Sequence, residues 1–197
     1  MAAPCEPPRP ALRFAPELLV KAQGPAGRIR LALFDVDGVL TDGRLYIGAA
    51  GESFKAFHTL DGMGLKLLRE GGIEPVVITG RDSAAVRFRV AELGLAQAHY
   101  GVADKLVVAE QVLAQRGCDW DATAVIGDDW ADLPLLLRAG FACAPPQGHA
   151  EARAVAHHIT AAAAGQGAAR EFCDLLLMAS GRYAEAYEAH ANAPLGR

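Results

Sequence analysis

The sequence predicts an α/β fold with a mainly parallel, doubly wound sheet, and three observations support this prediction. Short apolar runs alternate with stretches whose apolar residues recur at helical spacing. Glycines separate many of these runs, as expected for turns and helix ends. Polar residues directly follow three of the apolar runs, and ligands bind beyond the carboxyl ends of strands in such sheets. The 197 residues suffice for one domain with a sizeable core.

The expected elements follow in chain order. Residues 1–27 are expected to form a Pro-rich tail with a short helix over 16–23, and residues 182–197 a C-terminal tail. Between them, residues 28–181 are expected to form the domain. Its strands are expected within 29–35, 73–82, 98–101, 122–129, 141–145 and 157–160. Its helices are expected within 62–72, 83–94, 104–117, 130–140 and 168–181, and one more helix is expected between the last two strands.

Residues 44–57 alternate in polarity around Gly48-Ala-Ala-Gly51, which predicts a β-hairpin inserted after the first strand. Between Asp42 and Ile73 there is room for this hairpin and one helix. A covering domain over the strand ends does not fit there. We therefore expect a small insertion and no cap domain.

The composition argues against several function classes. A formal net charge of -4 argues against a general nucleic-acid binder, because phosphate-backbone binding normally requires a basic face. The four cysteines are scattered without metal-ligand spacing, which is typical of reduced thiols. No stretch has the length and hydropathy of a signal-peptide core or a bilayer span. We expect a cytoplasmic protein that binds neither nucleic acid nor membranes.

Carboxylates gather where two of the predicted strands end. Asp35 and Asp37 follow the first apolar run, and Asp128 and Asp129 follow another. Carboxylates packed together repel one another, and a hard divalent cation relieves this repulsion. A carboxylate set without a nearby His or Cys cluster favours Mg²⁺ over Zn²⁺.

The same edge of the sheet offers groups that bind phosphate. Thr79 has a hydroxyl, and the backbone N–H groups around Gly80 and Arg81 precede a helix, which is a natural anion site. Lys105 begins another predicted helix and supplies a positive charge. Together with a metal and carboxylates, these groups predict a phosphoryl-transfer site.

These motifs strongly resemble those of the haloacid dehalogenase-like phosphatases. The matching residues are Asp-x-Asp-Gly in "DVDGVLTDG", Thr-Gly-Arg in "ITGRDS", a downstream lysine, and Gly-Asp-Asp-x-x-Asp in "IGDDWADLPLL". The segments "GESFKAFHTLDGMGLKLL" and "GAAREFCDLLLMASG" resemble the capless branch, from about residue 28 to residue 181. The resemblance implies a Rossmann-like fold and Mg²⁺-dependent hydrolysis of a sugar-acid phosphate such as 3-deoxy-D-manno-octulosonate 8-phosphate, in lipopolysaccharide biosynthesis.

The resemblance also implies roles for individual residues. Asp35 is the expected nucleophile, and Asp37 the general acid and then the general base. Thr79 and Lys105 would bind the phosphoryl oxygens. Mg²⁺ would be held by Asp35, the backbone carbonyl of Asp37, and Asp128. Asp129 and Asp132 would orient the loop and the lysine.

For the remainder of the substrate, the resemblance points to a set of polar and basic positions: His58, Thr59, Leu60, Asp61, Gly62, Lys66, Arg81 and Arg89, besides Asp37 and Lys105. Some members have arginine where this chain has Leu60 or Lys66, and a basic residue where it has Gln166. Because these replacements remove a charge or a bidentate donor, the exact sugar acid stays open. The capless branch forms homotetramers in which neighbouring subunits cover each active site.

Several alternatives stay open. The nearest ones are a phosphatase for a nine-carbon ulosonate 9-phosphate and a broad small-molecule phosphatase. From the residues alone, Asp61 and Gly62 could simply cap the following helix, and Lys66, Arg81 and Arg89 could be solvated. A non-enzymatic phospho-acceptor module also pairs aspartates with a Thr and a Lys, but it lacks the late Gly-Asp-Asp. A catalytically idle regulatory subunit is disfavoured by the complete motif set.

Overall fold

The computed structural model describes residues 11–192, so residues 1–10 and 193–197 of the two predicted tails lie outside the described residues. The centre of the fold is a six-stranded sheet of order β5-β4-β1-β6-β7-β8 in which each pairing is parallel. The predicted parallel α/β sheet is therefore confirmed. The strands are β1 Leu31–Phe34, β4 Glu74–Ile78, β5 Gln97–His99, β6 Thr123–Ile126, β7 Phe141–Ala144 and β8 His158–Ile159.

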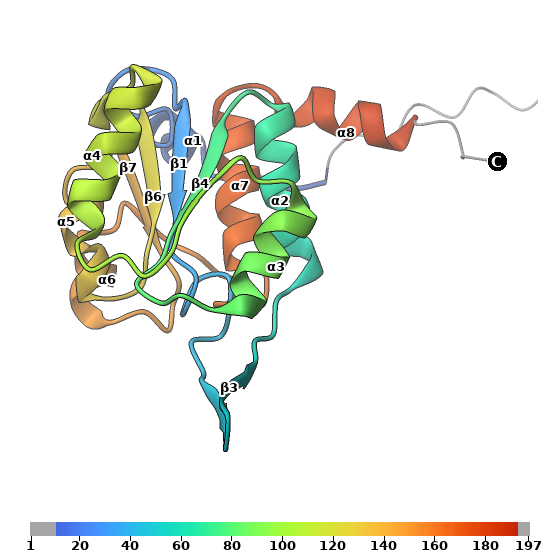
Figure 1. The fold of residues 1–197 in the computed structure, drawn as a ribbon. Coiled ribbons are helices and arrows are strands. Elements are labelled where there is room, and N and C mark those ends of the chain that lie inside the picture. Colours follow the sequence, from blue (N-terminus) through green and yellow to red (C-terminus); the bar gives the residue numbers. More distant parts are fainter. Residues whose placement is uncertain (1–10, 193–197) are drawn as a thin grey trace, which may run out of the picture.

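Helices cover both faces of this sheet (Figure 1). Ala32 and Phe34 of β1 pack in one hydrophobic cluster, and Leu31 and Leu33 pack in the other, because successive strand side chains face opposite sides. The first cluster includes residues of α2 Thr59–Glu70, α3 Ala84–Leu93 and α7 Ala168–Ala179, with α1 Pro16–Lys21 beside α7. The second includes residues of α4 Lys105–Arg116, α5 Leu133–Leu136 and α6 Ala150–Val155.

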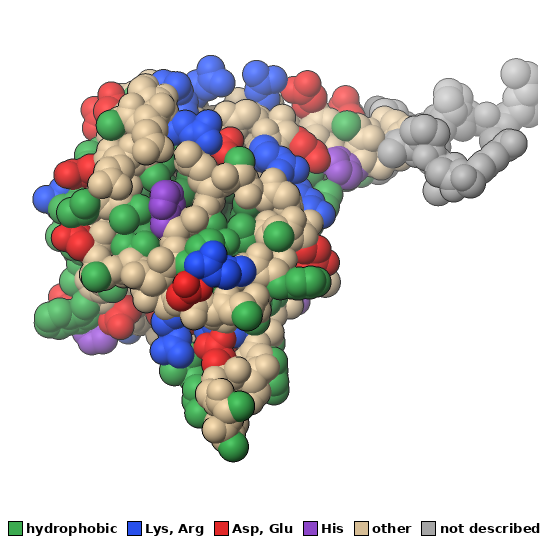
Figure 2. Space-filling model, viewed as in Figure 1, with side chains coloured by type: hydrophobic (Ala, Val, Ile, Leu, Met, Phe, Trp, Pro, Cys, Tyr) green, Lys and Arg blue, Asp and Glu red, His purple; other side chains and the backbone are tan. Residues whose placement is uncertain are grey.

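The predicted hairpin is confirmed and projects from the body of the domain (Figure 1). It consists of β2 Tyr46–Gly48 and β3 Gly51–Phe54, paired antiparallel. The rings of Tyr46 and Phe54 stack with centroids 4.4 Å apart. Apolar side chains are seen on the projecting hairpin (Figure 2), where Ile47 and Phe54 are 62% and 56% exposed.

Some helices differ from the sequence-based expectation. Helix α2 begins at Thr59, earlier than expected, because the Nδ1 of His58 accepts a hydrogen bond from the N–H of Leu60. The expected helix 130–140 is divided into a 3₁₀ turn, Trp130–Asp132, and the short α5. The segment expected as a C-terminal tail contains helix α8, Tyr183–Ala191. A further 3₁₀ turn, Trp120–Ala122, precedes β6.

Within residues 11–192, every helix falls short of the length and hydropathy needed to cross a membrane.

Candidate active site

Asp35 lies where three neighbouring strands end. It directly follows β1, and its backbone N–H donates to the carbonyl of Ile126 at the end of β6 (3.2 Å). Thr79 follows β4 on the other side of β1, and Asp128 follows β6. Only 9% of the Asp35 side chain is exposed. The parallel order of β4, β1 and β6 thus brings three distant sequence motifs to one edge of the sheet.

Lys105 holds the carboxylate of Asp35 in place. Its Nζ lies 2.6 Å from Asp35 Oδ1 and 2.7 Å from Asp132 Oδ1. Burial lowers the pKa of Lys105, but the two carboxylates raise it above its ordinary value. The lysine at the start of α4 therefore stays charged within a nearly closed cluster.

Asp132 orients both the lysine and the loop after β6. Its Oδ2 accepts from the backbone N–H groups of Asp128 (3.1 Å) and Asp129 (3.3 Å). Asp129 caps the 3₁₀ turn that begins at Trp130. The geometry agrees with the expected orienting roles of Asp129 and Asp132.

The carboxylates of Asp35, Asp128 and Asp132 form a crowded acidic set. Each offers an oxygen within 4.8 Å of those of the other two. Burial, followed by repulsion from Asp132, raises the pKa of Asp35 to about 6 despite the opposing Lys105. Burial, followed by repulsion from Asp35 and Asp132, raises the pKa of Asp128 to about 8. All-oxygen donors under this repulsion fit a hard divalent cation such as Mg²⁺.

Gly38 allows the loop after β1 to approach Asp128 closely. It has a φ of +96°, and a Cβ at this position would lie 2.0 Å from Asp128 Oδ2. A side chain here would therefore displace a carboxylate of the acidic set.

Asp37 lies at the same edge of the sheet. Its carboxylate is held by Lys55, a residue that the sequence pattern does not mark as functional. Its Oδ1 accepts from Lys55 Nζ (2.5 Å) and from Thr41 Oγ1 (3.4 Å). Arg81 Nε lies 3.8 Å from Asp37 Oδ2, so this predicted substrate residue stands beside the predicted acid–base. Lys55 belongs to an alternating polar and apolar hairpin sequence, where a charged residue gives no specific signal.

Thr79 is buried at the end of β4. Its N–H donates to the carbonyl of His99, and its Oγ1 accepts from the N–H of Arg81 at 3.4 Å. Thr79 thus stands at the same sheet edge as Asp35, and its role in phosphoryl binding stays a prediction, since its hydroxyl supports its own turn.

The predicted substrate segment 58–62 comprises the N-cap residue and the first turn of α2. Asp61 is buried, and its carboxylate accepts from the backbone N–H groups of Gly167 (3.3 Å) and Arg170 (2.8 Å). It therefore caps α7 instead of its own helix. Leu60 is 51% exposed, and Thr59 lines a shallow groove between the hairpin base and α3.

Two predicted basic residues lie along α2 and α3. The guanidinium of Arg89 packs against Gly62, pairs with Glu92 at 2.7 Å and lines the groove described above. Lys66 is half-buried on α2. Of the predicted cations, the structure thus brings Lys105 and Arg81 to the two aspartates, while Arg89 lies along the neighbouring groove.

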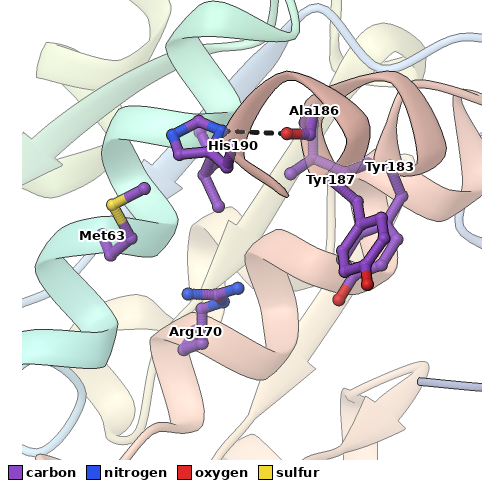
Figure 3. Close-up of a pocket in the computed structure, with 8 residues that line it drawn as sticks. Met63, Arg170, Tyr183, Ala186, Tyr187 and His190 are labelled. Carbon is purple, nitrogen blue, oxygen red and sulfur yellow. Dashed lines mark hydrogen bonds between the residues drawn. The ribbon is translucent and has the colours of Figure 1, made fainter. Parts of the chain in front are cut away.

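A second hollow in the described residues lies between α2, α7 and α8 (Figure 3). Its lining is mostly apolar and aromatic, contains the basic Arg170 of α7 and has no carboxylate. The lining residues are Met63, Leu67, Arg170, Leu177, Tyr183, Ala186, Tyr187 and His190. It offers no carboxylate to hold Mg²⁺ or to form an aspartyl-phosphate.

Comparisons with known proteins show which family the chain belongs to. A family model described as haloacid dehalogenase-like hydrolase matches residues 99–172. The curated 3-deoxy-D-manno-octulosonate 8-phosphate phosphatase KdsC of Yersinia pestis is 40% identical over 154 residues, which are 78% of this chain and 82% of that protein. KdsC of Salmonella typhimurium is 38% identical over 172 residues, which are 87% and 89% of the two chains.

Solved structures show the same likeness. The phosphatase of Moraxella catarrhalis, in complex with magnesium, phosphate and a KDO molecule, has a TM-score of 0.81 and 38% identity over 88% of this chain and 97% of that chain. The Yersinia pestis phosphatase has a TM-score of 0.81 and 36% identity over 86% and 90% of the two chains. This chain therefore belongs to the 3-deoxy-D-manno-octulosonate 8-phosphate phosphatase family within the haloacid dehalogenase-like hydrolases.

Proposed function

We propose that this protein is a Mg²⁺-dependent phosphomonoesterase that hydrolyses 3-deoxy-D-manno-octulosonate 8-phosphate to the sugar acid and phosphate, in lipopolysaccharide biosynthesis. The observation that carries the proposal is the buried cluster of Asp35, Lys105 and Asp132 beside Asp128. The names of the chain's relatives supply the substrate.

The metal site is proposed at the acidic set. Asp35 and Asp128 would hold Mg²⁺ together with the backbone carbonyl of Asp37, and Asp132 would support them through Lys105 and the loop. When bound, the ion offsets the repulsion that raises the pKa values of Asp35 and Asp128, and it polarises the phosphoryl group.

The first chemical step transfers the phosphoryl group to the protein. A carboxylate oxygen of Asp35 attacks phosphorus while the bond from phosphorus to the sugar oxygen breaks. The electron pair of that bond goes to the sugar oxygen, which takes a proton from Asp37. Lys105 and Thr79 bind the phosphoryl oxygens and counter their charge.

The second step releases phosphate. Asp37 now takes a proton from a water molecule, whose oxygen attacks the phosphorus of the aspartyl-phosphate. The bond between phosphorus and Asp35 breaks, and the carboxylate is restored. Dividing hydrolysis into two displacements lets one set of residues serve both.

Recognition of the sugar acid is proposed for basic residues near Asp37. Arg81 is the best placed, because its side chain is 46% exposed and its Nε lies 3.8 Å from Asp37. An arginine can bind a carboxylate through two hydrogen bonds. Arg89 and Thr59 would act farther along the groove that they line, and Lys66 and the other residues of the segment 58–62 remain further candidates.

The assembly is proposed to be a homotetramer whose neighbouring subunits cover each site. The projecting hairpin exposes Leu45, Ile47 and Phe54. A two-stranded hairpin is marginally stable alone, and exposed apolar side chains are typical of an interface. A sedimentation velocity measurement tests this, and a monomer at all concentrations would contradict it.

The substrate proposal is tested by measuring kcat/KM with Mg²⁺ across a panel of sugar phosphates. The panel includes the eight-carbon substrate, a nine-carbon ulosonate 9-phosphate and simple hexose phosphates. A clear preference for the eight-carbon compound is expected. Preference for the nine-carbon compound, or similar values for all, would replace the substrate but keep the phosphatase. A long-lived phospho-Asp35 without phosphate release would instead indicate a phospho-acceptor module.

A further inference from the structure

The ammonium group of Lys55 lies in a buried ion-pair network between the hairpin and the candidate active site. Only 1% of the Lys55 side chain is exposed, and its Nζ lies 2.5 Å from Asp37 Oδ1 and 3.2 Å from Glu52 Oε2. A buried cation is costly unless its charge is paired, and breaking such a pair destabilises the remaining charge. The two carboxylates therefore fix the position of this amine.

Glu52 is itself anchored to the loop after β4. Its carboxylate accepts a hydrogen bond from Ser83 Oγ, which lowers the pKa of Glu52, and it lies 3.5 Å from Arg81 Nη2. The network thus extends from Ser83 through Glu52 and Lys55 to Asp37. Three segments far apart in the sequence are tied together at the mouth of the site.

The two carboxylate oxygens of Asp37 have different surroundings. Oδ1 receives hydrogen bonds from Lys55 and Thr41, whereas Oδ2 is buried and has no hydrogen-bond partner among the described residues. Arg81 Nε, at 3.8 Å, is beyond hydrogen-bond reach of Oδ2. One oxygen is thus held by the protein, and the other has no hydrogen-bond donor within reach among the described residues.

We propose that Lys55 is a positioning residue that fixes the Asp37 carboxylate through Oδ1, so that Oδ2 exchanges the proton with the substrate oxygen and then with water. This inference rests on the proposed phosphatase function and adds the hairpin to the active site. Without the lysine, the carboxylate can rotate and present either oxygen at several angles.

The test compares Lys55→Met, which keeps most of the side-chain length, with Lys21→Met at the exposed end of α1. For the sugar phosphate, kcat of Lys55→Met is expected to fall roughly tenfold to a hundredfold, because misplacing a group by about 1 Å can cost about a hundredfold. KM should stay within about twofold. The control should match wild type in both values.

A leaving-group comparison separates positioning from general damage. An aryl phosphate releases a weakly basic phenolate that needs little protonation, so its first phosphoryl transfer should be nearly unaffected in Lys55→Met. The rate of this step is read as the rate of phenolate release in single-turnover mixing. Equal losses for both substrates would indicate a merely structural role and overturn the inference, as would an unchanged kcat for the sugar phosphate.

Two further controls keep the outcomes distinct. If Lys55→Met does not fold, as judged by its melting curve, Lys55→Arg keeps the charge and displaces the donor; the same selective loss of kcat is expected, and its absence refutes the inference. If wild type releases phosphate from neither substrate, the proposed function fails. If wild type is active and only the Lys55 prediction fails, the inference alone is wrong.

Discussion

Asp128→Asn is expected to stabilise the metal-free protein while removing its response to Mg²⁺. The pKa of Asp128 is about 8 in the native state against an ordinary 3.8. An acid with a raised native pKa binds its proton more tightly when folded, so the free energy of unfolding falls as the pH rises from about 4 to about 8. At about 1.4 kcal/mol per pH unit, the ionised group costs at most roughly 6 kcal/mol.

Solvent screens part of this repulsion at a partly exposed carboxylate. We therefore expect Asp128→Asn to gain about 1–3 kcal/mol near pH 8, which corresponds to roughly 3–10 °C in melting temperature for a chain of this size. Thermal melts with a chelator, and then with excess Mg²⁺, measure both effects. Asp129→Asn, which keeps a good capping residue, is the matched control. A lower melting temperature for Asp128→Asn in chelator, or an undiminished rise with Mg²⁺, would refute the reasoning.

Other perturbations address the remaining contacts. Lys105→Met leaves the buried carboxylates of Asp35 and Asp132 without their cation, so urea unfolding should show a loss of about 3–5 kcal/mol; an unchanged midpoint would contradict this. Asp61→Ala removes the cap of α7 and should cost about 1 kcal/mol in thermal melts; an unchanged melting temperature would contradict this. In chelator, Asp35 should lower the wild-type melting temperature as the pH rises from about 4 to about 6, and Asp128 should lower it from about 4 to about 8, and excess Mg²⁺ should flatten this slope; parallel slopes would argue against metal binding there.

The sequence indicates the sheet and its edge residues because both depend on short-range patterns. Apolar runs mark the buried strands, and the parallel-sheet rule then places Asp35, Thr79 and Asp128 at one edge. The structure agrees, since β4, β1 and β6 are neighbours. The lysine at the start of α4 also reaches this edge, where it meets Asp35.

Other features depend on tertiary contacts that no local pattern reveals. Asp61 looks like a cap for the helix that contains it, but it caps α7, more than a hundred residues later in the chain. Lys55 looks like a solvated hairpin residue, but folding carries its amine to Asp37 and Glu52. Helix α8 contains no buried residue, so the apolar periodicity that marks a helix is weak there.

The most direct measurement concerns the atom that accepts the phosphoryl group. Wild-type protein is mixed with substrate and Mg²⁺, quenched in acid and treated with borohydride, which reduces an acyl phosphate to the alcohol. Peptide mass spectrometry should then find homoserine at position 35, in the peptide that follows β1, and Asp35→Asn should release no phosphate. Turnover without modification of Asp35, or with modification of another carboxylate, would contradict the proposed role of this residue.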